Sequence, residues 1–417
     1  MLAVNMLSIT RKLAVLMLLA SVTIILASCL SPAQQKVRDG DVSLGKMDWN
    51  NAVISYSQAV IMDPQLKLDK KIAGAYAGKG DETYKNHDYV SAAFNYGKAV
   101  SFNPGIDVRL RFGHAQYEVG IQNLNQHKYQ EAVVALTGAI KHGYANKDVY
   151  LSRARAYANE GLYSYAIADA SNFLDSDVQS AEAYEIRGHA YFATGEYGKA
   201  AADLSRAIEL DPSAKEAYFD RGLAWRTMGE FTMAIADFRK VINLDPSYLE
   251  AFIWLGRAYY STMDYYAAIE QFSRAIDMDN KEAAVAYNDR AVCLGRIGRF
   301  NEAVADLDTL TGMNPAFYLA CYNRGVLYMK MVQPGRAIEE LDIYLCLDIF
   351  DKFGCRGLAM GWRGYYTEYT MCCIRPGISE RAISECNRIL SQRSRYDRLP
   401  YTEGSLYFGS ERSDYAW

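Results

Sequence analysis

One stretch of the sequence recurs at a fixed interval of 34 residues. Residues 195–213 are GEYGKAAADLSRAIELDPS, and residues 229–247 are GEFTMAIADFRKVINLDPS. A period of 20–50 residues is typical of repeat proteins, in which each repeat is a small unit that stacks on its neighbours. A chain of 417 residues with this period therefore predicts a stacked array rather than one globular domain.

Three columns of residues follow the repeat along the chain. An alanine occupies one position of ten units: Ala52, Ala92, Ala132, Ala166, Ala200, Ala234, Ala268, Ala303, Ala337 and Ala382. An aromatic residue stands three positions earlier in the first eight units: Trp49, Tyr89, Tyr129, Tyr163, Tyr197, Phe231, Tyr265 and Phe300. Five of the nine prolines share a later position: Pro64, Pro104, Pro212, Pro246 and Pro315. Small residues let two helices approach closely and proline ends a helix, so each unit is predicted to be a helical hairpin.

The unit from residue 181 shows the pattern clearly. Tyr184 and Tyr191 are seven residues apart with Gly188 between them, which places all three on one face of a first helix. Gly195 then favours a tight turn. A second helix is predicted by residues at steps of four and three, namely Ala200, Leu204 and Ala207.

This pattern resembles the tetratricopeptide repeat, W-x2-L-G-x2-Y followed by A-x3-F, A and P. In the unit from residue 181 the matching residues are Tyr184, Gly188, Tyr191, Ala200, Leu204, Ala207 and Pro212. The resemblance implies an all-α fold, a right-handed α-solenoid of about ten stacked hairpins. The units begin near residues 33, 73, 113, 147, 181, 215, 249, 284, 318 and 363, so the array covers residues 33–394.

The spacing changes at both ends of the array. The first units are 40 residues apart, which predicts longer connections around residues 67–72 and 107–112. The last unit begins 45 residues after its predecessor, which predicts an insertion at residues 349–362. Residues 395–417 have no helical period and are expected to form an irregular tail.

A second regularity joins the two helices of a unit. In five units an arginine of the first helix is followed sixteen residues later by an acid: Arg153 and Asp169, Arg187 and Asp203, Arg221 and Asp237, Arg290 and Asp306, and Arg324 and Glu340. Where the arginine is replaced by Leu255, the acid is replaced by Gln271. We expect these to be structural ion pairs within each hairpin.

Residues 1–28 differ from the rest and have the layout of a signal peptide. Arg11 and Lys12 precede an apolar run from Leu13 to Ser28 that is short for a membrane-spanning helix. Residues 26–29, LASC, resemble the bacterial lipobox, which implies cleavage before Cys29, lipidation of its thiol and a short tether at residues 29–32. The alternative is an uncleaved anchor helix. Leu30, rather than an aspartate, after the cysteine favours the outer membrane over the inner one.

The seven later cysteines lie at uneven spacings and contain no CxxC pair, so they do not predict a zinc site: Cys293, Cys321, Cys346, Cys355, Cys372, Cys373 and Cys386. Buried free thiols are expected, with one disulfide near the C-terminus as the alternative. The five histidines, His87, His114, His127, His142 and His189, have no metal-ligand spacing.

No common catalytic motif occurs in the sequence, so we expect neither an enzyme nor a bound cofactor or metal. The formal net charge of −4 argues against nonspecific nucleic-acid binding, which needs a basic surface. What remains is a surface for partners. An enzymatic site in residues 349–362 or in the tail is the weakest alternative.

The resemblance implies a concave groove lined by the second, fifth, ninth and twelfth residue of each first helix. The expected groove residues are Tyr117, Ile121, Leu151, Arg155, Glu185, His189, Phe219, Leu223, Arg226, Ile253, Arg257, Tyr260, Asn288, Val292, Tyr322 and Val326. Apolar anchors with arginines suit an extended or helical peptide. The leading hypothesis is a lipid-anchored periplasmic adaptor that binds envelope proteins, and the alternative is a carrier of a hydrophobic small ligand that works with a transporter.

Overall fold

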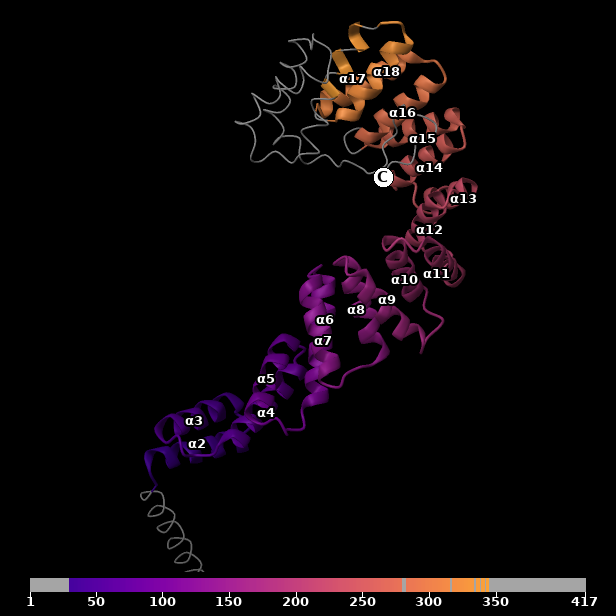
Figure 1. The fold of residues 1–417 in the computed structure, drawn as a ribbon. Coiled ribbons are helices and arrows are strands. Elements are labelled where there is room, and N and C mark those ends of the chain that lie inside the picture. The colour runs from indigo at the N-terminus through magenta and orange to yellow at the C-terminus, as the bar shows by residue number, and fades with distance from the viewer. Residues whose placement is uncertain are drawn as a thin grey trace, which may run out of the picture. The chain divides into compact units, whose positions relative to one another are not determined.

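A computed structural model describes residues 30–279, 283–315, 317–333, 335–337, 339–341 and 343–344. Every regular element in these residues is a helix, and successive helices form antiparallel hairpins (Figure 1). This confirms, for the described residues, the expectation of an all-α solenoid of stacked helical hairpins.

Each hairpin consists of a first and a second helix. The first helices are α2 (Pro32–Gly45), α4 (Asp69–Lys85), α6 (Arg109–Asn125), α8 (Lys147–Asn159), α10 (Ala181–Ala193), α12 (Lys215–Thr227), α14 (Leu249–Ser261), α16 (Ala284–Arg296) and α18 (Tyr318–Lys330). The second helices are α3 (Trp49–Met62), α5 (Tyr89–Phe102), α7 (Tyr129–Lys141), α9 (Tyr163–Leu174), α11 (Tyr197–Leu210), α13 (Phe231–Leu244), α15 (Tyr265–Met278) and α17 (Phe300–Met313).

The chain divides into two compact units, an N-terminal unit up to Ala190 and a C-terminal unit from Tyr191. The boundary falls within α10. In the N-terminal unit each hairpin packs on the next, as α3 does on α4, α5 on α6 and α7 on α8. In the C-terminal unit the same contacts join α11 to α12, α13 to α14 and α15 to α16.

Close approach of the two helices explains the column of alanines. From Ala52 to Ala337 every alanine of this column is fully buried. Facing residues of the first helix are equally constrained: a Cβ on Gly222 would lie 2.8 Å from the Phe238 ring, and one on Gly256 would lie 2.6 Å from the Phe272 ring. The small residues are therefore needed for the aromatic ring of the second helix to reach the first helix.

The turn inside each hairpin places one residue in the left-handed region. Gly161, Gly195, Gly229 and Gly298 adopt φ between 73° and 84°, as the sequence indicates for a helix-ending glycine. At the same position, other hairpins place residues with a Cβ at φ of 56–61°: Met47, His87, His127, Met263 and Val332. The turn geometry is thus retained even where glycine is absent, at a cost in backbone strain.

The longer repeat of the first hairpins has a different cause from the one that the spacing suggested. Residues 69–72 and 109–112 belong to α4 and α6, each 17 residues long, whereas α12 has 13 residues. The prediction that these residues are connections is therefore wrong. One extra helical turn at the start of the first helix accounts for most of the added length.

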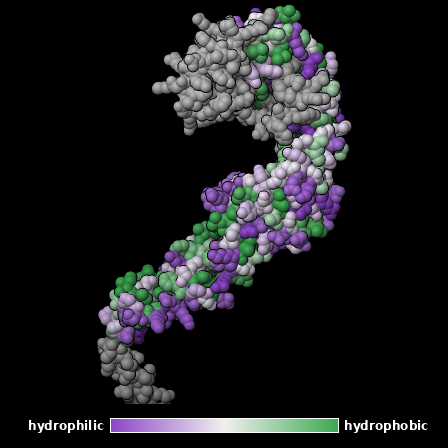
Figure 2. Space-filling model, viewed as in Figure 1, coloured by the Kyte–Doolittle hydropathy of each residue, from purple (hydrophilic) through white to green (hydrophobic). Residues whose placement is uncertain are grey.

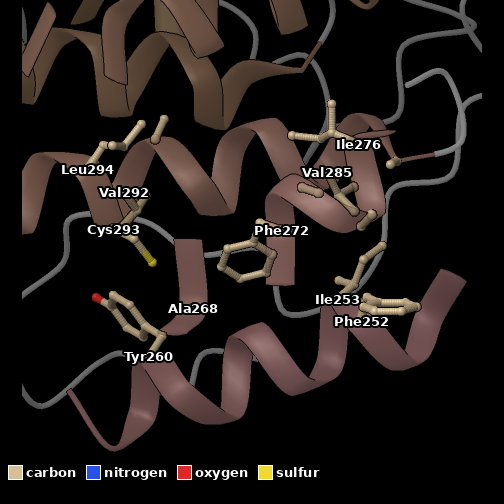
Figure 3. Packing of buried hydrophobic residues seen from close by; sticks show 14 of the residues in the cluster. Phe252, Ile253, Tyr260, Ala268, Phe272, Ile276, Val285, Val292, Cys293 and Leu294 are labelled. Atoms are coloured by element: carbon tan, nitrogen blue, oxygen red, sulfur yellow. The ribbon is translucent and has the colours of Figure 1, made fainter. Parts of the chain in front are cut away.

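Among the described residues of the C-terminal unit, one large cluster of buried side chains extends from α13 to α18. Figure 3 shows Phe272 between α14 and α16, with Phe252, Ile253 and Val285 close by. Cys293 and Cys321 are buried free thiols, and burial raises the pKa of the Cys293 thiol well above its ordinary value. These two cysteines therefore behave as small hydrophobic residues.

Several sequence predictions fall outside the described residues. They are the signal peptide at residues 1–28, Cys29, the insertion at residues 349–362, the hairpin near residue 363, the other five late cysteines and the tail at residues 395–417. Within the part of the chain that the structure describes, no helix is both long and apolar enough to cross a membrane.

Candidate protein-binding surfaces

The arginine–acid pairs lie at the contact between helices. Arg221 of α12 donates from Nε and Nη2 to the two carboxylate oxygens of Asp237 on α13, at 2.8 and 2.7 Å. Its third nitrogen, Nη1, donates to Ser205 Oγ of the preceding second helix at 2.9 Å. One guanidinium thus joins three helices.

The same arrangement recurs along the chain. Arg153 contacts Asp169 at 2.7 Å, Arg290 contacts Asp306 at 2.7 Å, and Arg324 contacts Glu340 at 2.8 Å. Each also contacts the preceding second helix, through Thr137, Ser273 and Asp308 respectively. Arg187 contacts Ser171 in the same way, and Asp203, its expected partner, lies in the other unit.

These pairs are partly desolvated, so they hold hairpins together rather than offer a binding surface. The side chains of Arg221 and Asp237 are 18% and 7% exposed. Burial raises the pKa of the Asp237 carboxyl above its ordinary value, and the Arg221 guanidinium opposes that rise. The sixteen-residue interval after Arg221 predicts its acidic partner, Asp237. The hydroxyl of Ser205, sixteen residues before Arg221, is a second partner that the sequence analysis missed.

The first two hairpins use a different polar contact. Asp41 of α2 accepts a hydrogen bond from the Tyr56 hydroxyl at 2.7 Å. It also forms an ion pair with Lys71 of α4 at 2.6 Å. Burial raises the pKa of Asp41, but the contacts with Lys71 and Tyr56 outweigh it and hold the pKa below its ordinary value. Asp81, Tyr96 and Arg111 repeat this triad 40 residues later. The next equivalents are apolar: Ile121, Leu136 and Ala145.

Tyr117 belongs to a group of rings on the first-helix side of the N-terminal unit. Tyr84 of α4, His114 and Tyr117 of α6, and Tyr144 before α8 form this aromatic cluster, and all four are half-buried. The His114 ring centre lies 4.6 Å from that of Tyr144 and 5.5 Å from that of Tyr84. The Tyr84 hydroxyl is hydrogen-bonded to His114 Nδ1.

A glycine permits this cluster. A Cβ on Gly113 would lie 2.8 Å from the Tyr144 Cβ and 3.0 Å from the Ala139 carbonyl oxygen, so a larger residue would displace Tyr144. Burial raises the pKa of Tyr117 and Tyr144, and both phenols therefore stay neutral at pH 7.

Two carboxylates, Glu118 and Asp148, lie near the aromatic cluster. Glu118 lies 3.7 Å from His114 Nε2, and both Glu118 and Asp148 raise the pKa of Tyr117 and Tyr144 further. The nearby Arg155 pairs with Glu182. Ring faces beside carboxylates suit a lysine or arginine side chain.

The other groove residues expected in this unit are scattered. Arg155 is exposed, whereas Glu185 and His189 on α10 are half-buried. The His189 ring makes an edge contact with Tyr163, with ring centres 6.0 Å apart. None of these three belongs to the aromatic cluster, which the structure builds from Tyr117 and three residues that the sequence analysis did not place in the groove.

In the C-terminal unit an indole ring lies against two guanidinium groups. Arg226 of α12 is 4.5 Å from the Trp254 ring centre, and Arg257 of α14 is 4.6 Å from it. The adjacent Tyr260 accepts a hydrogen bond from Arg296 Nη2 at 3.0 Å. Arginine and aromatic side chains thus alternate along this part of the first-helix side.

Four residues expected in an exposed groove are buried: Ile253, Arg257, Tyr260 and Asn288. Val292 is also fully buried. The expectation of exposure is therefore wrong for these positions. Lateral hydrogen bonds between first helices account for two of them: Arg257 Nε donates to Asp289 of α16 at 2.6 Å, and Asn323 of α18 donates to Asn288 at 2.8 Å. Ile253, Tyr260 and Val292 are buried because they belong to the hydrophobic core cluster.

The remaining expected residues lie at the edge of the core. Phe219 contacts the rings of Tyr248 and Phe238, with centres 5.0 and 5.8 Å away. Leu223, Tyr322 and Val326 are half-buried and pack against the core cluster. Their exposed parts can contact a partner, but their first role is packing.

Among the described residues, no group of three or more His, Cys, Asp or Glu side chains is arranged to hold a metal ion.

Two protein-family models match part of the chain. The model described as TPR repeat matches residues 188–229, and the model described as Tetratricopeptide repeat matches residues 219–283. Both ranges fall on the hairpins where the sequence period is most regular. No curated protein matches the chain at a significant level.

Several solved structures are similar to part of the chain. The crystal structure of MamA protein is 28% identical over 43% of this chain and 96% of its own, with a TM-score of 0.38. The crystal structure of YrrB, described as a TPR protein with an unusual peptide-binding site, is 22% identical over 47% and 97%, with a TM-score of 0.38. MamA 41-end from Desulfovibrio magneticus RS-1 is 20% identical over 40% and 95%, with a TM-score of 0.38. Likeness at these TM-scores transfers no property of those proteins to this chain.

Proposed function

We propose that this tetratricopeptide-repeat protein is a non-catalytic adaptor of a bacterial cell envelope, attached to the outer membrane through lipidated Cys29 and facing the periplasm. It holds an extended segment of a partner protein against its first helices. The observation that carries the proposal is the aromatic cluster of Tyr84, His114, Tyr117 and Tyr144, which gathers four half-buried rings from successive hairpins.

The chemistry of the cluster favours one class of partner segment. Neutral phenol rings beside Glu118 and Asp148 favour a lysine or arginine side chain, through cation–π contact and charge attraction. Flanking apolar residues of the segment would contact Ile121 and Leu151, which are half-buried on α6 and α8. Such a site resembles the anchor positions of peptide-binding grooves, where a few aromatic residues supply most of the binding energy.

Site-specific photo-crosslinking in intact cells tests this proposal. A photoreactive phenylalanine analogue replaces Tyr117 in one variant and Tyr165 in a matched control. Tyr165 is also a tyrosine of the N-terminal unit, but it is 61% exposed on the second helix α9. We expect a defined protein adduct from position 117 and none from position 165. Equal yields from both positions would contradict a partner site on the first helices.

Protein purified from the same cells distinguishes an adaptor from a carrier of a small hydrophobic ligand. Native mass spectrometry of the gently purified chain would show a retained small molecule if the chain were a carrier. An adaptor gives the mass of the polypeptide with its lipid groups alone. A retained ligand together with no adduct at position 117 would favour the carrier.

A further inference from the structure

The end of the first hairpin at which the chain enters α2 carries exposed apolar residues. Because α2 and α3 are antiparallel, the last residues of α3 lie at the same end as Leu30 and Pro32. There Ile61 is 79% exposed, Met62 is 54% exposed and Leu30 is 36% exposed. Figure 2 shows hydrophobic residues on one side of this N-terminal hairpin and hydrophilic residues on the other.

The position of Ile61 is apolar only in this hairpin among those described. The equivalent positions of the following second helices are all exposed and hold Ser101, Lys141, Asp175, Glu209, Asn243, Asp277 and Gly312. An exposed isoleucine where seven other repeats have a polar residue or glycine is not required by the fold. At this position an exposed apolar side chain is therefore particular to the first hairpin among those described.

The sequence next to the hairpin limits how far that surface can lie from Cys29. The apolar run ends at Ser28, and only Cys29, Leu30 and Ser31 separate it from α2. Three extended residues span at most about 10 Å. If the chain is attached to a membrane at Cys29, the end of the hairpin with Ile61 and Met62 therefore lies at the headgroup level of that membrane.

We propose that Ile61 and Met62 insert into the lipid surface beside Cys29 and form a second membrane contact. This inference rests on the proposed membrane attachment. The contact holds the first hairpin at a fixed orientation to the bilayer, which a tether of three residues alone does not do. Interfacial insertion of apolar side chains reaches about 5–10 Å into the headgroup and acyl boundary.

The test compares two cysteine variants of the full chain, Ile61→Cys and Ser101→Cys. Position 101 is the equivalent exposed site of the second hairpin. Membranes from expressing cells react with a water-soluble maleimide before and after detergent is added. Peptide mass spectrometry measures the labelling of each introduced thiol separately from the native cysteines.

We expect residue 61 to react at least about tenfold more slowly in membranes than in detergent, because insertion removes the thiol from water. Residue 101 should react equally in both. Equal rates at residue 61 in a membrane-bound chain would overturn the inference and leave the attachment intact. Recovery of the chain in the soluble fraction would refute both. If residue 61 stays unreactive in detergent, a protein rather than lipid covers it, and the inference is wrong.

Discussion

Replacing Arg221 by alanine would leave the Asp237 carboxylate in a nearly dry site without its guanidinium. Arg221 makes two hydrogen bonds to Asp237 and one to Ser205, so the change affects α11, α12 and α13 together. Exposed ion pairs contribute about 0–1 kcal/mol, whereas breaking a fully buried pair costs about 3–5 kcal/mol. With side chains 18% and 7% exposed, this pair lies between those limits. We expect a loss of about 2 kcal/mol for Arg221→Ala.

A double-mutant cycle with Asp237→Ala isolates the pair itself. We expect a coupling energy of about 1–2 kcal/mol, since these residues are in direct contact. The stability of a repeat array is local, so native-state hydrogen exchange of amides in α12 and α13 is the suitable assay. A loss of 2 kcal/mol corresponds to exchange about 30-fold faster.

An exposed pair provides the matched control for this cycle. Arg274 contacts Glu270 at 2.6 Å, but these side chains are 56% and 58% exposed. The cycle of Arg274→Ala with Glu270→Ala should give at most about 0.5 kcal/mol. A coupling energy for Arg221 and Asp237 as small as that of the control would refute the reasoning that partial burial makes the pair structural.

Three further changes test other parts of the fold. Gly256→Ala should lower the free energy of unfolding by about 1–3 kcal/mol, because the new Cβ would lie 2.6 Å from the Phe272 ring. Gly198→Ala should not lower it, because nothing lies within 4 Å of the new Cβ. Urea unfolding of the two variants measures the difference. Met263→Gly should stabilise the fold by about 0.5–1 kcal/mol, because glycine adopts φ 61° without the strain of a side chain. Gly229→Ala should destabilise it, because φ is 84° at that residue. We expect the two thermal midpoints to shift in opposite directions, and equal shifts would contradict the turn argument. Asp41→Asn should lower the exchange protection of α2 and α3 at pH 7, and the difference from the unaltered chain should shrink as the pH falls below 3.8. The lowered pKa of Asp41 favours its charged form in the folded state, and that contribution is lost on protonation; a difference independent of pH would argue against it.

The sequence period predicts helix positions well where side chains repeat with it. The buried alanine column and the sixteen-residue interval from Arg221 to Asp237 both depend on contacts within one hairpin, so a single unit contains the whole signal. The extra turns of α4 and α6 carry no such signal, because a longer helix and a longer connection add the same number of residues.

Contacts between hairpins are harder to predict from the sequence. The triad of Asp41, Tyr56 and Lys71 spans two hairpins, and its register changes where the 40-residue spacing gives way to 34. Arg257 has the register of an exposed groove residue, yet its partner Asp289 lies 32 residues away on the next first helix. The position of Arg257 within the repeat specifies the side of the helix on which it lies, but not which residues cover that side.

The affinity of the partner segment for the full chain tests the central claim most directly. The segment identified by cross-linking at position 117 is made as a peptide, and its dissociation constant is measured with the unaltered chain and with Tyr117→Ala and Glu118→Gln variants. The account predicts at least about tenfold weaker binding for each variant, and a similar loss when the lysine or arginine of the peptide is replaced by alanine. Unchanged affinity in all three cases would contradict binding at the aromatic cluster.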